Sequence, residues 1–104
     1  MYTWVDGRVY TGEWKDNNMH GYGVYTWKDG RRYEGYYERD KKHGFGIYFW
    51  SDGRRYEGNW VEGKQHGEGK YFLADGSMKI GNWEYGRRTH WVGDHQEDNE
   101  GDVQ

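Results

Sequence analysis

Large apolar side chains alternate with polar ones over short stretches of this chain, and each stretch ends near a glycine. The rings of Tyr10 and Trp14, for example, are separated by Thr11 and Glu13 on either side of a glycine. An alternation of period two is typical of a β-strand with one buried face. The pattern predicts strands at about 9–15, 22–28, 32–38, 45–51, 55–61, 68–74 and 78–84, with a short strand at each end.

Short polar connections separate the predicted strands, so we expect neighbouring strands to be antiparallel and to follow sequence order. In the first unit, one connection is Asp16-Asn17-Asn18, and the next contains Asp29-Gly30. Because glycine tolerates a positive φ, Asp29-Gly30 indicates a two-residue hairpin turn. The same interpretation applies to three further dipeptides: Asp6-Gly7, Asp52-Gly53 and Asp75-Gly76.

The pattern returns every 23 residues. Gly12, Gly35, Gly58 and Gly81 keep this spacing, as do columns of tyrosine, tryptophan and His-Gly. Such a period indicates hairpin units that stabilise one another by stacking. We predict a repeat domain at residues 1–93, followed by a tail. It contains a half repeat at 1–9, full repeats from 10, 33 and 56, and a degenerate capping repeat from 79.

Side chains alternate across a strand, so the tyrosine, tryptophan and glycine columns share one face of the predicted sheet. We expect rings from adjacent strands to lie flat over the bare glycine backbone. The opposite face is mixed, and in the second full repeat it becomes more apolar, at Phe45, Ile47 and Phe49.

Composition narrows the fold class further. The 104 residues include 21 aromatic rings but only 13 Ala, Val, Ile, Leu and Met, of which Leu73 is the one leucine. This excludes an ordinary helical bundle or α/β domain, whose core needs aliphatic residues. No apolar run approaches the ~18 residues of a membrane span, and no signal peptide pattern follows Met1. With no cysteine in the chain, these features lead us to expect a cytoplasmic location.

The net charge of −3 comes from one end of the chain. Residues 94–104 carry five acidic and no basic residues, so we predict an acidic, solvated C-terminal tail. The remaining residues carry 15 basic and 13 acidic side chains, which is close to neutral. A near-neutral body argues against nucleic acid as a partner, since that would require a marked basic patch.

The three full repeats resemble the MORN (membrane occupation and recognition nexus) repeat, whose pattern is roughly Y-x-G-x-W, a turn, H-G-x-G, an aromatic residue and D-G. The matching segments are YTGEWKDNNMHGYGVYTWKDG, YEGYYERDKKHGFGIYFWSDG and YEGNWVEGKQHGEGKYFLADG. The fourth unit departs from the pattern, because Lys79 replaces the leading tyrosine. The resemblance implies an all-β, elongated, single-layer, twisted antiparallel sheet. It also implies a scaffold or interaction module, which can be associated with cytoskeletal, ciliary or membrane assemblies.

A single sheet has no second layer, so we expect one side of the ring row to stay open as a groove. Exposed apolar surface of this kind suits a partner helix or an extended peptide, and Tyr and Trp are common hot-spot residues. The predicted groove residues are Tyr10, Trp14, Tyr25, Trp27, Tyr33, Tyr37, Tyr48, Trp50, Tyr56, Trp60, Tyr71 and Trp83.

Arginine pairs recur beside the Asp-Gly turns and form a second candidate surface, a basic ladder. Its members are Arg31, Arg32, Arg54, Arg55, Arg87 and Arg88. In one interpretation, the arginines contact phosphoinositide headgroups, the acidic surface of a membrane or an acidic protein segment. In the second interpretation, they belong to solvated turns, because Glu34 and Glu57 lie close by and exposed ion pairs contribute little.

Recurrent histidines and aspartates invite a search for chemistry. Equivalent positions two strands apart are separated by about 10 Å, whereas zinc ligands lie about 2 Å from the metal. His20, His43 and His66 therefore cannot share a metal, and we expect each to brace its own hairpin through turn hydrogen bonds. Asp29, Asp52 and Asp75 are interpreted as turn residues. The sequence predicts no catalytic residues, metal or cofactor, and so no enzyme.

Two alternatives remain open. Aromatic-glycine hairpin repeats also occur in choline- or glycan-binding modules, where rings cage a cation or stack on sugars. The first strand begins mid-unit, so it is expected to present an unpaired edge. Either a preceding domain of a longer protein pairs with that edge, or another chain covers it, as a homodimer or by strand addition.

Overall fold

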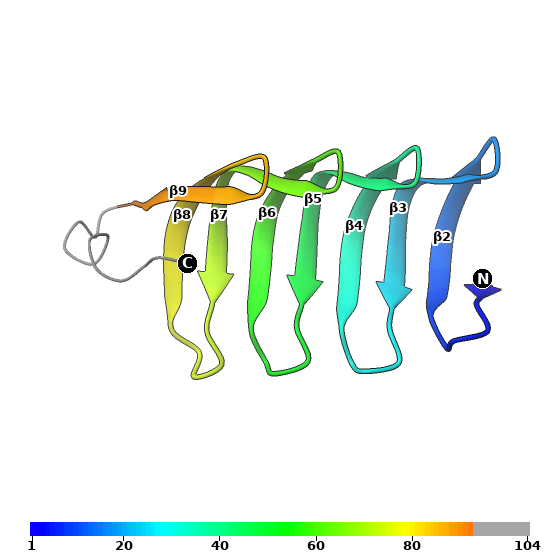
Figure 1. Cartoon of the computed structure of the whole chain (residues 1–104), viewed down its shortest axis with the longest axis horizontal. Coiled ribbons are helices and arrows are strands. Elements are labelled where there is room, and N and C mark those ends of the chain that lie inside the picture. Colours follow the sequence, from blue (N-terminus) through cyan, green and yellow to red (C-terminus); the bar gives the residue numbers. More distant parts are fainter. Residues whose placement is uncertain (93–104) are drawn as a thin grey trace.

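The computed structural model describes residues 1–92; the predicted acidic tail, residues 94–104, lies outside the described residues. The described chain forms one antiparallel sheet in which the strands follow sequence order from β1 to β9 (Figure 1). The strands are β1 (Tyr2–Thr3), β2 (Val9–Lys15), β3 (Asn18–Thr26), β4 (Arg32–Glu38), β5 (Lys41–Phe49), β6 (Arg55–Val61), β7 (Lys64–Phe72), β8 (Met78–Glu84) and β9 (Arg87–Trp91).

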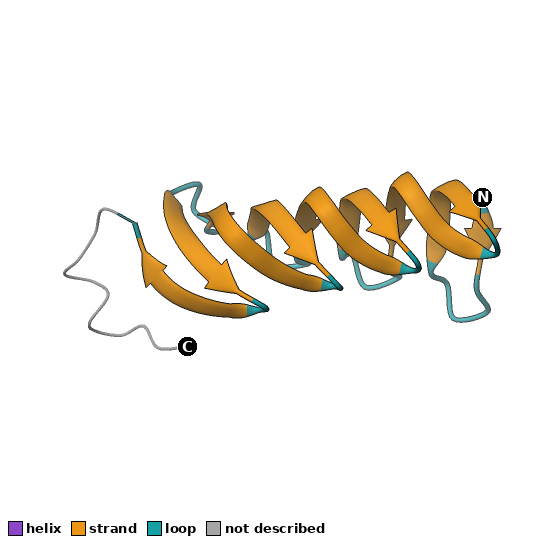
Figure 2. Cartoon of the chain, turned by 90° about the horizontal axis from the view of Figure 1, so that it is seen from above, coloured by secondary structure: helices purple, strands orange, loops and turns teal. Residues whose placement is uncertain are grey.

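The sheet is long and narrow, with extents of 46 × 24 × 17 Å. Seen from above, the strands follow one another along the long axis, and residues 1–92 contribute no second layer (Figure 2). The predicted all-β, elongated, single-layer meander is therefore confirmed. Nothing in residues 1–92 forms a helix long and apolar enough to cross a membrane.

The first strand of each repeat lies where the sequence predicts it, but the second strand is displaced. In the first full repeat it spans Asn18–Thr26 rather than 22–28. The cause is the hairpin turn, which has only two residues: Asp16 and Asn17, with φ of 52° and 69°. Such turns match the right-handed twist of the flanking strands, so pairing resumes at once. Equivalent turns lie at Arg39-Asp40, Glu62-Gly63 and Tyr85-Gly86.

The Asp-Gly dipeptides belong to longer loops, so their interpretation as two-residue hairpin turns is wrong. In the loop from Trp27 to Arg31, the Trp27 amide donates to the Arg31 carbonyl and the Gly30 amide to the Trp27 carbonyl. The Asp29 carboxylate accepts a hydrogen bond from the Arg31 amide at 3.1 Å. Gly30 has a φ of 102°. The aspartate and glycine thus close a loop by side-chain bonding and positive φ, rather than forming the turn alone.

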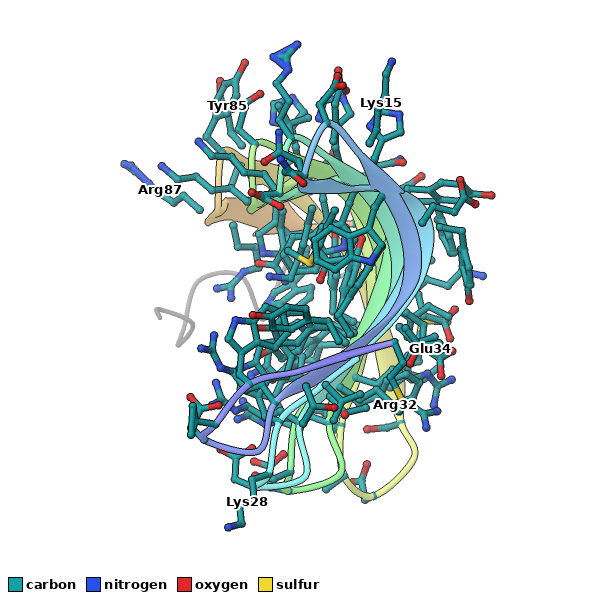
Figure 3. All side chains as sticks on the ribbon, turned by 90° about the vertical axis from the view of Figure 1, so that its right-hand side faces the viewer. Lys15, Lys28, Arg32, Glu34, Tyr85 and Arg87 are labelled. Carbon is teal, nitrogen blue, oxygen red and sulfur yellow. The ribbon has the colours of Figure 1, made fainter. Side chains whose placement is uncertain are left out.

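Each hairpin is bent near its turn. Between the pairs Gly12–Gly23 and Trp14–Met19, β2 has one residue, Glu13. The opposite strand, β3, has three residues there, His20 to Tyr22. Gly21, at the centre of these three, has a φ of 70°, a conformation that favours glycine. The extra length bends the sheet, and the hairpin tips fold over one side of it, seen end-on in Figure 3. We call this side the concave face and the opposite side the convex face.

The core is a stack of rings on the concave face. Tyr10, Tyr33 and Tyr56 have no exposed surface, and each packs edge-to-face against rings of its own and the next repeat. The Tyr33 ring covers two glycines. A Cβ on Gly35 would lie 2.6 Å from the Tyr33 hydroxyl, and a Cβ on Gly46 would overlap the same ring. The predicted packing of rings over bare glycine backbone is confirmed.

The fourth unit replaces the missing tyrosine with a tryptophan from the next strand. Lys79 occupies the position of Tyr56, and Trp91 of β9 packs over Gly81, where an added Cβ would lie 2.9 Å from its ring. Trp91 is 8% exposed and makes an edge-to-face contact with Trp83 at 5.9 Å. Trp91 therefore closes the C-terminal end of the ring stack.

Candidate binding face

Most of the predicted groove residues are core residues. Seven of the twelve are buried: Tyr10, Tyr25, Tyr33, Tyr37, Tyr56, Trp60 and Trp83. The expectation that one side of every ring stays open is wrong for these seven. The bent hairpin tips bring a second set of rings onto the first, so a single sheet buries its own concave face.

The remaining five rings retain exposed surface. Trp14, near the first hairpin tip, is 43% exposed. The other four, Trp27, Tyr48, Trp50 and Tyr71, are half-buried and lie on the concave face next to the Asp-Gly loops, in two adjacent rows. Trp4, which was not among the predicted groove residues, is half-buried beside them. We call Trp4 and these four residues the lip rings. Four of them form a continuous series, since Trp27 lies 5.8 Å from Tyr48, Tyr48 lies 4.9 Å from Trp50, and Trp50 lies 6.0 Å from Tyr71. Trp4 is joined to this series through the buried Tyr25 ring, which lies 5.4 Å from Trp4 and 4.5 Å from Trp27.

Arginines of the Asp-Gly loops pack on the lip rings. The Arg31 guanidinium lies 4.9 Å from the Trp27 ring centroid and 2.9 Å from the Asp29 carboxylate. Arg54 repeats this arrangement with Trp50 and Asp52, and donates a hydrogen bond to the Tyr71 hydroxyl at 2.9 Å. The hydrogen bonds from Arg31 lower the pKa of Asp29. These guanidinium charges are therefore largely neutralised within their own loops.

The neighbouring arginine of each pair lies on the other face. Arg32 is on the convex face beside Glu34, its salt-bridge partner at 2.5 Å (Figure 3). Arg55 forms the equivalent bridge to Glu57 at 2.8 Å, and its guanidinium lies 3.9 Å from the Phe72 ring. Because adjacent strand residues point to opposite faces, Arg-Arg pairs cannot form one ladder.

Arg87 and Arg88 stand apart from these loops, on β9 at the C-terminal end. Arg87 is exposed and points away from the sheet (Figure 3), whereas the Arg88 guanidinium packs 4.4 Å from the Trp91 ring. The six predicted arginines thus lie in three separate places. They do not form the continuous basic surface that the sequence suggested.

A lysine is enclosed by the ring stack in the second full repeat. The ammonium nitrogen of Lys42 lies 5.4 Å from the Tyr33 centroid, 5.6 Å from Tyr48 and 5.4 Å from Trp60. Each distance is within the range of a cation–π interaction. Burial lowers the pKa of Lys42, because the charged form loses hydration. The position pairs with Tyr37, and its equivalents in the other repeats are Met19, Gln65 and Arg88.

The sequence matches the model of one known repeat family. The sequence model of the MORN repeat matches residues 10–31, 33–54 and 56–78, well over half of the chain. The chain belongs to the MORN repeat family. MORN repeats are generally protein or membrane interaction modules and carry no enzymatic activity of their own. The comparison with curated proteins gives no significant match.

The histidines of the three MORN units differ in their contacts. His66 accepts a hydrogen bond through Nδ1 from the Tyr85 amide, 3.2 Å away, in the turn of the next hairpin. The expectation that it braces its own hairpin is therefore wrong. His43 does approach its own hairpin, with Nε2 3.5 Å from the Glu38 carboxylate. Within residues 1–92, no three His, Asp or Glu side chains are placed to hold a metal ion.

Two residues of the face were not singled out from the MORN pattern. Trp91 lies outside the repeat register. The sequence signal that could have identified it is an aromatic residue in the fourth unit, where Lys79 replaces the leading tyrosine. Lys42 lies in a column with Met19, Gln65 and Arg88, so the signal was a charge in a ring-facing column whose members in the other two full repeats are neutral. Neither signal specifies a contact until the hairpin tip is folded over the rings.

Proposed function

We propose that this chain is a non-catalytic scaffold module that binds a segment of a partner protein along the lip rings of the concave face. The supporting observation is that these rings run over consecutive repeats and keep exposed surface, while the deeper rings are buried. Equivalent lip positions are two strands, or about 10 Å, apart. Side chains of an extended peptide alternate between its two faces, and six residues span about 20 Å, so side chains on one face can match every second repeat.

The convex face also carries exposed rings, but they are confined to one region. Tyr22, Tyr36 and Phe45 are 45–51% exposed, and Tyr22 contacts Tyr36 at 5.5 Å. At the equivalent positions of the third full repeat stand Asn59 and Glu68, so this surface does not continue along the array. The lip rings extend further, which favours the concave face for an elongated partner.

We propose that the module is a structural component of a cytoplasmic assembly, either cytoskeletal, ciliary or membrane-associated. Membership of the MORN repeat family supports this setting, and an elongated sheet that repeats its contacts at a fixed period is compatible with it. Direct lipid binding through the arginines has less support, because Arg31, Arg54, Arg32 and Arg55 already have acidic partners. Choline or glycan binding also has less support, since the cage of Tyr33, Tyr48 and Trp60 holds the side chain of Lys42.

Affinity capture with matched variants tests the proposal. The lip variant is Trp27→Leu with Trp50→Leu, because Leu73 occupies the same position in the third full repeat. The control is Tyr22→Glu with Tyr36→Asn on the convex face, which introduces the residue types of Glu68 and Asn59. Each pair therefore imports side chains that the fold already accepts.

Circular dichroism and thermal melts first establish that both variants fold. Partner peptides are cross-linked to the captured chain. We expect these peptides to be lost from the lip variant and retained by the convex control. Retention of the same partners by the folded lip variant, or loss from the control alone, would contradict the proposed binding face.

A further inference from the structure

The strand rows at the centre of the concave face carry charge of one sign. Three paired rows of strand residues hold the buried rings and the glycines that they cover. These rows contain no Asp or Glu. They contain three cations: Lys42, Lys79 and Arg88. These rows are therefore positive, although the chain as a whole is acidic.

Lys42 and Lys79 are held by rings rather than by carboxylates. Lys42 contacts three ring faces, and the ammonium of Lys79 lies 5.2 Å from the Trp91 ring. Within residues 1–92, neither ammonium has a carboxylate within ion-pair distance. A partly buried ammonium that lacks a counter-charge is costly, and a carboxylate brought to it forms a strong, charge-assisted hydrogen bond.

We propose that the concave face recognises an extended acidic peptide segment, whose carboxylates bind Lys42 and Lys79 while its apolar side chains pack on the lip rings. This deepens the proposed function by naming the chemistry of the partner, and it rests on that function. Lys42 is on β5 and Lys79 on β8, three strand spacings or about 14 Å apart across the sheet. Lys79 lies in the row of Tyr33 and Lys42 in the row of Tyr37, four residues or about 13 Å further along the strands. The two positions are therefore about 19 Å apart on the sheet, a distance that two carboxylates six residues apart in an extended chain can span.

The ring stack does not require lysine at these two positions. The column of Lys42 contains Met19, Gln65 and Arg88, and the column of Lys79 contains Tyr10, Tyr33 and Tyr56. A ring stack that only needed packing would accept the neutral residues of these columns at both positions. Charge at two such positions on one face indicates selection of an anionic ligand.

Fluorescence anisotropy with two synthetic peptides tests this inference. The probes are the acidic dodecamer (Glu-Glu-Tyr)₄ and its neutral counterpart (Gln-Gln-Tyr)₄, each titrated with the full chain. The variant is Lys42→Gln with Lys79→Gln, and Gln65 shows that glutamine fits the first column. The control is Lys15→Gln with Lys28→Gln, which changes net charge equally at exposed sites at opposite ends of the strands (Figure 3).

The tail carries five carboxylates of its own, so every titration is repeated in a chain with D94N, E97Q, D98N, E100Q and D102N. We expect the acidic peptide to bind about tenfold more tightly than the neutral one, and the concave-face variant to remove that difference. The exposed control should keep it. The difference should shrink as salt rises.

Three results would overturn the inference. One is equal affinity for the two peptides, which leaves the proposed function intact because that function is tested through Trp27 and Trp50. The second is an equal loss in the exposed control, which would show a net-charge effect only. The third is binding of phosphatidylserine vesicles through Lys42 and Lys79 without binding of the acidic peptide, which would assign the face to a membrane surface.

Discussion

The hydroxyl of Tyr33 donates a hydrogen bond to the main-chain carbonyl oxygen of Tyr36, 3.0 Å away. Tyr36 is the residue at which pairing between β4 and β5 is interrupted, so its carbonyl lacks a strand partner on that side. Tyr10 and Tyr56 make the same contact in their own units, with Glu13 and Asn59. One ring thus performs two tasks, since it covers the glycine pair and satisfies the irregular backbone beside it.

Tyr33→Phe tests the second task alone. The ring stays, but the Tyr36 carbonyl loses its partner, so we expect the free energy of unfolding to fall by about 1 kcal/mol. Urea denaturation measures this change. Tyr22→Phe, on the convex face, is the control and should change stability by only a few tenths of a kcal/mol. Equal effects of the two substitutions would show that the hydroxyl contact contributes nothing specific.

Gly46→Ala tests the covering of glycine by the tyrosine ring. A Cβ at this position would overlap the Tyr33 ring, which is fully buried and cannot move away. We expect a loss of about 3 kcal/mol or more, or failure to fold, as seen in overpacked cores. Thermal melts followed by circular dichroism measure it.

Gly76→Ala is the matched comparison for that prediction. Gly76 has a φ of 93°, but nothing lies within 4 Å of an added Cβ. The substitution carries only the backbone cost of a positive φ, about 1–2 kcal/mol. If Gly76→Ala destabilised the protein more than Gly46→Ala, steric covering by the ring would not be the dominant effect.

Trp91→Ala tests the C-terminal closure of the stack. The substitution removes the ring that covers Gly81 and contacts Trp83, and we expect a loss of about 3 kcal/mol. In a repeat array the loss should be local, so hydrogen exchange should accelerate in β8 and β9 more than in β4 and β5. Val92→Ala, an exposed neighbour, is the control. Uniform acceleration along the sheet would argue against an end-specific role.

Glu62→Asn is expected to stabilise the protein. Glu62 and Gly63 form a two-residue turn in which both residues have positive φ, and asparagine tolerates this conformation better than glutamate does. The lost ion pair to Lys41, at 3.6 Å, is exposed and contributes little. We expect a gain of about 0.5–1 kcal/mol in urea denaturation. A decrease in stability would mean that the ion pair outweighs turn conformation.

Stability should fall at alkaline pH because buried tyrosines resist ionisation. Burial raises the pKa of Tyr56 to about 12 and raises the pKa of Tyr33 and Tyr37 further. Below pH 10, both the folded and the unfolded chain keep these protons, so their stabilising contribution is complete. Above pH 10 only the unfolded chain releases them, and stability falls by ~1.4 kcal/mol per pH unit for each such tyrosine.

Denaturation curves from pH 8 to 12 measure this dependence. Tyr56→Phe removes one ionising group and should reduce the slope between pH 10 and 12 by the share of one tyrosine. An unchanged stability from pH 8 to 12 would contradict the burial of these hydroxyls.

The sequence predicts the repeat, the strand type and the order of strands, because each follows from local patterns. Alternation gives the strands, short connections give the antiparallel order, and the 23-residue period gives the stacking. The turns were harder to predict. Asp29-Gly30 has the composition of a tight hairpin but belongs to a loop, whereas Arg39-Asp40 lacks the usual composition and forms the tight turn. Register between strands, which no local pattern specifies, decides between the two.

The accessible surface of the candidate site could not be predicted without the folded structure. Sequence alone identified the rings and arginines but not their accessibility, since accessibility depends on how strongly the sheet bends. The bend at Gly21 and its equivalents buries Tyr10, Tyr33 and Tyr56 and leaves Trp27 and Trp50 at the lip.

The sequence by itself therefore determined that this protein is a stack of ring-bearing hairpins, because periodicity and side-chain alternation are properties of the chain. Only the tertiary structure decided which rings form the core and that Lys42 lies within a cage of rings. These contacts join residues from different strands and hairpins. They come into existence only when the bent sheet brings those elements together.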